Sequence, residues 1–190
     1  MAEKKLNTVR INAGEWRSRL LKFPDAESLR PTPERVRQAV FNWLGQDLTG
    51  KVCLDLFAGT GVMGFEALSR NAKSVILVEK TTAVYKAILD NKATLSADAA
   101  HVVNTDALRF LDKNQQLFDV VFIDPPYHQG WLDKVLVQLP QHLSAEGVVY
   151  VEAEYALKNN DIFNLTWQVF KQSKAGNVFY HLIKLRDDTN

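Results

Sequence analysis

Residues 51–64, KVCLDLFAGTGVMG, decide the fold of this chain. The first half is an apolar run typical of a buried strand, and the second half is a loop that leads into a helix. Gly59 and Gly61 flank Thr60, and glycines let a backbone approach a ligand closely because they carry no Cβ. The helix that follows has unpaired N–H groups at its start. The stretch therefore predicts a ligand site at the carboxyl end of the first core strand.

The alternation of strand and helix continues on the C-terminal side of this stretch. We expect strands at 51–57, 74–79, 101–104, 118–124 and 147–154, and helices at 61–71, 81–95, 106–114 and 131–143. Nearly continuous apolar strands are typical of a parallel sheet that is covered on both faces. Residues 165–186 differ, because two strand patterns meet at Gly176 and Asn177 with no helix between them. This pattern predicts an antiparallel hairpin at the sheet edge.

A smaller pattern precedes the sheet. Residues 8–23 predict a hairpin, with TVRI as one strand, a turn at residues 12–14 and WRSRLLKF as the other strand. A helix should follow, with Thr32 as its N-cap, Pro33 as its first residue and Gly45 at its end. The predicted fold is α/β, with a Rossmann-like, seven-stranded, mostly parallel sheet in residues 46–190 and a hairpin-and-helix extension in residues 1–45.

Composition limits the classes of function. A length of 190 residues, 46% of them hydrophobic, and a net charge of +1 fit one soluble globular domain, which we expect to be a monomer. A single cysteine, Cys53, suits the cytoplasm; no apolar run could span a membrane, and the histidines lack metal-ligand spacing. Residues 1–40 hold nine Lys/Arg against five Asp/Glu. This basic excess indicates either contact with a polyanion or an ordinary solvated surface.

Acidic residues stand where three of the predicted parallel strands end. Besides Asp55, Glu79 ends the second strand 18 residues after Gly61, where a carboxylate can accept hydrogen bonds from two ribose hydroxyls. Asp106 could accept from an adenine amino group while the Ala107 N–H donates to the ring. Asp106 could also cap the helix that follows it, and the two roles are compatible.

The glycine loop is compatible with two cofactors. Gly59, Gly61 and Gly64 match the bare G-x-G-x-x-G pattern of nicotinamide enzymes, but Asp55 would crowd a pyrophosphate. Asp55 is better suited to S-adenosylmethionine, which carries a sulfonium and an amino group and no phosphate. We therefore expect S-adenosylmethionine as the cofactor, and no metal. The residues expected to bind it are Asp55, Phe57, Gly59, Thr60, Gly61, Glu79, Lys80, Asp106 and Ala107.

The run Asp124-Pro125-Pro126-Tyr127 follows the strand at 118–124, and two prolines cannot continue a central strand because neither has an N–H. Together with DLFAGTG it resembles class I S-adenosylmethionine-dependent methyltransferases with a [D/N]-P-P-[Y/F/W] motif, which methylate exocyclic or amide nitrogens. Asp124 and the Pro125 carbonyl could accept the two protons of an aryl amine and favour the charge that develops on it. The double proline would fix the carbonyl direction, and Tyr127 could stack on the base.

A second resemblance covers most of the chain. The segments at 10–21, 29–44, 54–70, 78–80 and 122–127 are similar to the ribosomal small subunit methyltransferase D family, which methylates N2 of a guanine in 16S ribosomal RNA. It implies 16S RNA or the small subunit particle as partner, and a segment around Arg30–Arg37 that closes over cofactor and target. The implied RNA contacts are Arg10, Arg17, Arg19, Lys22, Arg30, Arg35 and Arg37. The chain departs from the family at 12–14, where a glycine pair is common, and at Ser18, where glycine is usual.

Other functions stay open at this point. An N6-adenine or N4-cytosine methyltransferase would use the same acceptors, although the sequence shows no separate target-recognition domain. A protein glutamine methyltransferase would favour Asn at position 124. An RNA-binding module without activity would not need the intact motif set, and an oxidoreductase would leave the Asp124–Tyr127 turn unexplained.

Overall fold

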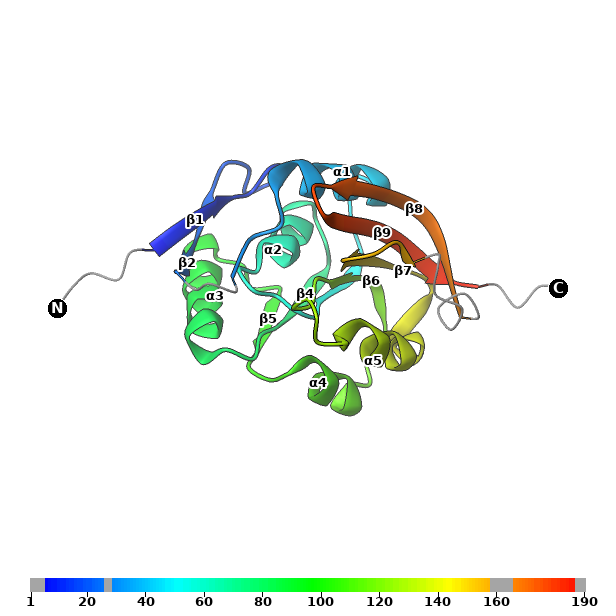
Figure 1. Cartoon of the computed structure of the whole chain (residues 1–190). Helices are drawn as coiled ribbons and strands as arrows, with labels where there is room; N and C mark the ends of the chain where they lie inside the picture. Colours follow the sequence, from blue (N-terminus) through cyan, green and yellow to red (C-terminus); the bar gives the residue numbers. More distant parts are fainter. Residues whose placement is uncertain (1–5, 26–28, 158–165, 187–190) are drawn as a thin grey trace.

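A seven-stranded sheet forms the centre of the molecule (Figure 1). The computed structural model describes residues 6–25, 29–157 and 166–186. The strands of the sheet are β3 (Val52–Asp55), β4 (Ser74–Val78), β5 (Ala100–Val103), β6 (Phe118–Ile123), β7 (Leu143–Ala153), β8 (Trp167–Ala175) and β9 (Val178–Leu185). Their order is β5-β4-β3-β6-β7-β9-β8, with β3 to β7 parallel and β9 antiparallel to β7 and β8. The predicted, mostly parallel sheet with a C-terminal antiparallel hairpin is confirmed.

Alternate residues of the central strands enter two hydrophobic clusters, one on each face of the sheet. In β3, Cys53 belongs to one cluster and Leu54 to the other, and Phe122 and Ile123 of β6 divide in the same way. Helices α1 (Glu34–Leu44), α2 (Val62–Ser69) and α3 (Thr82–Leu95) contribute to the first cluster, and α4 (Ala107–Lys113) and α5 (Trp131–Gln138) to the second (Figure 1). Because both faces are covered, ligands have access mainly at the ends of the strands.

The N-terminal hairpin consists of β1 (Leu6–Arg10) and β2 (Leu20–Pro24), which pair antiparallel. The hairpin is confirmed, but its predicted second strand begins too early, since residues 11–19 form the connection. Within this connection Ile11 is fully buried and the Trp16 ring lies 6.4 Å from that of Phe65. The Asn91 side chain of α3 accepts from the Lys22 N–H at 2.9 Å and donates to its carbonyl at 2.8 Å. The hairpin is therefore docked on α2 and α3 by both packing and hydrogen bonds.

Helix α1 begins one residue later than predicted. Pro33 itself is the N-cap, with an extended ψ of 145°, and its carbonyl accepts from the Val36 N–H at 2.9 Å. The prediction that Thr32 caps the helix is wrong, because Pro33 is the N-cap and the Thr32 side chain is buried near the Glu152 carboxyl group. Gly45 ends the helix with a φ of 94°, as predicted.

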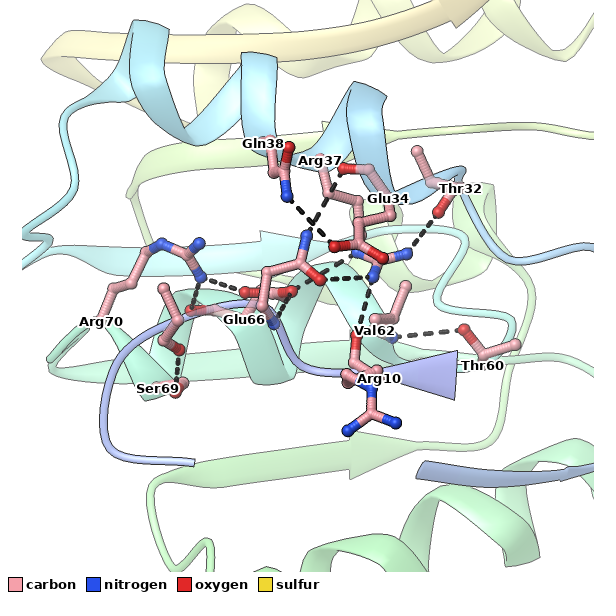
Figure 2. A network of polar contacts seen from close by, with 12 residues as sticks. Arg10, Thr32, Glu34, Arg37, Gln38, Thr60, Val62, Glu66, Ser69 and Arg70 are labelled. Carbon is pink, nitrogen blue, oxygen red and sulfur yellow. Dashed lines mark hydrogen bonds and ion pairs between the residues drawn. The ribbon is translucent and has the colours of Figure 1, made fainter. Parts of the chain in front are cut away.

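A buried carboxylate connects the hairpin to the helices of the sheet domain (Figure 2). Glu66 of α2 has no exposed surface, and it forms ion pairs with Arg37 of α1, at 3.4 Å, and with Arg70 one turn further along α2. The same carboxylate accepts the Asn12 N–H at 2.7 Å. Three segments that are far apart in the sequence therefore converge on one charge.

The predicted boundary between residues 45 and 46 does not separate two hydrophobic cores. Val9, Leu21 and Phe41 share one cluster with Cys53 and Phe65 from the other side of that boundary. Residues 1–45 as a distinct unit therefore stay a prediction about function, while the described part of that unit shares its core with the sheet.

Ser18 holds a φ of 69°, in the connection between β1 and β2. The left-handed region costs a residue with a Cβ about 1–2 kcal/mol, and glycine avoids that cost. We expect Ser18→Gly to raise the free energy of unfolding by about 0.5–1 kcal/mol, measured by urea unfolding. The matched control is Ser173→Gly in the exposed part of β8, which should lower it because glycine weakens a strand. A loss of stability in both variants would contradict strain at Ser18.

Candidate active site

A cavity of about 730 Å³ lies at the carboxyl ends of the parallel strands. It collects residues that follow β3, β4, β5 and β6, together with residues 29–33 from the segment that precedes α1. Most of the predicted site residues line it, namely Arg30, Phe57, Gly59, Glu79, Lys80, Asp106, Ala107, Asp124, Pro125, Pro126 and Tyr127. The structure therefore brings the glycine loop and the double-proline turn into one cavity.

Three predicted cofactor residues lie behind the cavity wall. Thr60 is buried, and Gly61 is the N-cap of α2 with a φ of 76°. Asp55 accepts the Gly64 N–H at 3.0 Å, so its carboxylate braces the first turn of α2. Burial raises the pKa of Asp55 to about 7, and the negative Glu79 adds to that rise. A direct contact between these residues and a cofactor stays a prediction.

Glu79 shapes the glycine loop as well as lining the cavity. One carboxylate oxygen accepts the Gly59 N–H at 3.1 Å and the other accepts the Thr81 N–H at 2.6 Å. A carboxylate has about four acceptor positions, so both oxygens can still accept from a ligand. The Asn104 side chain donates to the Glu79 carbonyl at 2.7 Å. The sequence analysis did not identify Asn104 as a residue near the site.

Asp106 is the N-cap of α4. Its side chain accepts the Arg109 N–H at 3.0 Å, which confirms the predicted capping role. The next residue, Ala107, is buried and lines the cavity with Asp106. Its N–H lies in the first turn of a helix, where backbone donors lack intrahelical partners.

Asp124 and Tyr127 form the opposite end of the cavity. β6 ends at Ile123, one residue before the Asp124 carboxyl group. Burial raises the pKa of Asp124 well above its usual range, and the nearby Glu152 and Asp55 raise it further. Tyr127 is half-buried, and burial followed by the charge of Asp124 raises its pKa, so the phenol stays neutral.

Two cavity residues were missed in the sequence analysis. Glu152 is 4% exposed, and the signal for it was an acid inside the apolar strand pattern GVVYVEAE. Trp131 begins α5, and its ring stands edge-on to Phe57 at 5.7 Å, with the Lys80 amine 5.8 Å from its centre. An aromatic residue just after the Asp124–Tyr127 turn was the signal for Trp131.

The predicted RNA contacts divide into two groups. Six are exposed, namely Arg10, Arg17, Arg19, Lys22, Arg30 and Arg35. Arg37 is 2% exposed, and this burial argues against the predicted contact with RNA, which stays untested. Its guanidinium donates to the carbonyls of Thr32 and Arg10, at 2.6 and 2.7 Å, and pairs with Glu66. Arg37 has a structural role, because its guanidinium is paired with groups inside the protein.

The part of the chain that the structure describes contains neither a membrane-spanning helix nor a metal-binding group. None of its helices is long and apolar enough to cross a membrane. No group of three or more His, Cys, Asp or Glu side chains among these residues could hold a metal ion.

Comparison with known proteins relates this geometry to a family. The family model described as Conserved hypothetical protein 95 matches residues 9–184. The chain is 40% identical over 177 residues to the Ribosomal RNA small subunit methyltransferase D of Escherichia coli (strain K12), across 92% of this chain and 88% of that protein. It is also 40% identical over 181 residues to the protein of that name from Haemophilus influenzae, across 92% of each.

Solved structures agree with these relatives. The Putative methyltransferase yhhF from Escherichia coli superposes with a TM-score of 0.83 at 36% identity, over 96% of this chain and 100% of that one. A Precorrin-6y C5,15-methyltransferase from Geobacter metallireducens, at 20% identity and a TM-score of 0.65, supports the fold alone. The chain has the class I methyltransferase fold, and the resemblance inferred from its sequence is confirmed. It belongs to the Conserved hypothetical protein 95 family, whose ribosomal RNA small subunit methyltransferases D it resembles over nearly its whole length.

Proposed function

We propose that this protein transfers a methyl group from S-adenosylmethionine to the N2 amine of a guanine in 16S ribosomal RNA. The observation that carries the proposal is that Asp124 and Pro125 line the same cavity as Gly59 and Glu79. The site for the target amine and the site for the nucleoside of the cofactor then lie side by side, and methyl transfer requires the two reactants to be held close together. The names of the family's curated members support small-subunit RNA as the substrate.

The cavity suits S-adenosylmethionine in size and in charge. Its volume of about 730 Å³ falls within the range usual for small-molecule sites. Four acids line it, against the two bases Arg30 and Lys80, so it favours a cationic ligand over a phosphate. The four acids are Glu79, Asp106, Asp124 and Glu152. Glu79 would hold the ribose, while Asp106 and the Ala107 N–H would face the adenine.

Catalysis would depend on orienting the amine and on stabilising its charge. S-adenosylmethionine supplies an electrophilic methyl group when bound. Asp124 and the Pro125 carbonyl accept the two N–H groups of the amine, which aims its lone pair and stabilises the positive charge that develops. Asp124 then takes the proton that the nitrogen releases, a role that suits a carboxyl group with a raised pKa. Tyr127 stacks on the base, worth roughly 1–3 kcal/mol.

Incubation with labelled S-adenosylmethionine and unmodified small-subunit RNA, free or in particles, tests this proposal. We expect nucleoside analysis to find N2-methylguanosine. Methyladenosine or methylcytidine as the only product would overturn the choice of base. We further propose that the protein acts as a monomer in the cytoplasm, which sedimentation and cell fractionation can check.

Asp124 and Glu79 should separate catalysis from cofactor binding. We expect Asp124→Ala to lower the single-turnover rate by about 10²–10³-fold with cofactor affinity retained, since it removes one transition-state acceptor. Glu79→Ala should weaken cofactor binding by about 10-fold or more, because a hydrogen bond to a charged acceptor contributes about 1.5–3 kcal/mol. Calorimetry gives the affinities, and Glu146→Ala at the exposed start of β7 is the control. Equal loss of both properties in both variants would contradict the division of roles.

The exposed basic residues of the hairpin are proposed to contact RNA phosphates. We expect the double variant Arg17→Gln/Lys22→Gln to bind small-subunit RNA less tightly. Its slope of log affinity against log salt should fall by about 1.4, because each phosphate contact on single-stranded RNA contributes about 0.7. Lys113→Gln/Lys171→Gln removes equal charge from exposed positions on α4 and β8 and should leave the slope unchanged. Equal slopes in both double variants would show that the hairpin does not contact the RNA.

A further inference from the structure

The position of Glu152 follows from the register of two parallel strands. Phe122 of β6 pairs with Tyr150 of β7, and Ile123 pairs with Val151. The next position along each strand therefore sets Asp124 beside Glu152, on the same face of the sheet. Both side chains line the cavity, although no motif in the sequence connects them.

We propose that Glu152 selects guanine, by accepting the N1–H of the target base while Asp124 and Pro125 accept its two N2 protons. This inference rests on the proposed function and assigns the choice of base to a residue. Guanine presents three adjacent N–H donors, one on N1 and two on N2, of which N1–H and one N2–H lie on its Watson–Crick edge. The cavity presents three acceptors in Asp124, the Pro125 carbonyl and Glu152.

Two polar neighbours of Glu152 favour its ionised form, in which both carboxylate oxygens accept hydrogen bonds. The Tyr150 hydroxyl donates to Oε1 at 2.6 Å. Burial and the charge of Glu152 raise the pKa of Tyr150 well above its usual value, so the phenol keeps its proton and remains a donor. Burial raises the pKa of Glu152, and the neighbouring Tyr150 hydroxyl and Thr32 side chain oppose that rise by favouring the ionised form. The Tyr150 hydroxyl occupies one of about four acceptor positions of the carboxylate, so others remain available for a ligand.

Because Asp124 and Glu152 are withdrawn from water, the stability of their ionised forms depends on the hydrogen-bond donors that a ligand brings. Desolvation raises the pKa of both Asp124 and Glu152, and the charge of Glu152 raises that of Asp124 further. A base that brings N–H donors offsets this cost by hydrogen bonding to both carboxylates. The amines of adenine and cytosine instead adjoin a ring nitrogen with a lone pair, which would face the Glu152 carboxylate without a proton between them. Such a mismatch in a buried site is strongly rejected.

The proposal can be tested with a base analogue that keeps the 2-amino group of guanine but lacks the proton on N1. The guanine that the wild-type protein methylates is first mapped and then replaced by 2-aminopurine in the same RNA. 2-Aminopurine keeps the 2-amino group but has a lone pair on N1, and it also lacks O6. We expect the wild-type protein to methylate guanine about 10²-fold faster or more. In Glu152→Gln the amide N–H can donate to N1, and this preference should shrink by at least about 10-fold.

Matched variants separate recognition from structure. Glu146→Gln makes the same change at the exposed start of β7 and should keep the wild-type preference. Melting temperature and cofactor affinity establish that each variant is folded. If Glu152→Gln does not fold, Glu152→Asp, which withdraws the carboxylate by one methylene, should also reduce the preference.

Each outcome decides the matter. Equal methylation of both RNAs by the wild-type protein would overturn the inference without any variant. A wild-type preference that persists in a folded Glu152 variant would overturn it as well. Absence of guanine methylation by the wild-type protein is a different result, because it would remove the proposed function itself.

Discussion

The arrangement of the N-terminal third depends on one buried charge, the carboxylate of Glu66. Removing an ion from water costs several kcal/mol, and the cost is recovered only when partners of good geometry surround the charge. Arg37, Arg70 and the Asn12 N–H supply those partners from three different segments. Loss of any one partner leaves part of the Glu66 charge uncompensated in a buried position. The network of Glu66 therefore connects the hairpin, α1 and α2 and stabilises their relative position (Figure 2).

This network extends to the cavity through Arg37. Its guanidinium donates to the Thr32 carbonyl at 2.6 Å, and the Thr32 side chain lies near Glu152, where it opposes the rise in the pKa of that acid. Helix α2, which carries Glu66, has Gly61 as its N-cap, and Asp55 accepts the Gly64 N–H in its first turn. Helix α2 thus has contacts both with the glycine loop and, through Arg37, with the segment at residues 29–33 that lines the cavity. This connection explains how an extension rich in basic charge can be part of the site while its core is shared with the sheet.

The parts of this structure that could be predicted follow from short-range rules. Strand and helix periods predict the sheet, and the carboxyl ends of parallel strands gather Glu79, Asp106 and Asp124 without knowledge of side-chain contacts. The errors arise where a distant partner decides. Arg37 resembles a surface charge in the sequence, because its partner Glu66 lies 29 residues further along the chain. Glu152 becomes significant only through the register of β7 with β6, which no local pattern specifies.

In the described part of the chain Asp55, Glu66 and Glu152 are buried and Asp124 is half-buried, and these four acids are of two kinds. Glu66 is neutralised by two arginines, whereas none of the ion pairs in the described part of the chain involves Asp55, Asp124 or Glu152. Burial raises the pKa of all three, so their ionised forms destabilise the folded protein. Such groups persist where a ligand can supply the missing donors or positive charge. Asp124 and Glu152 line the cavity, and Asp55 lies behind its glycine loop. A bound sulfonium, an ammonium group or the N–H groups of a base would stabilise the ionised forms of these acids at this place.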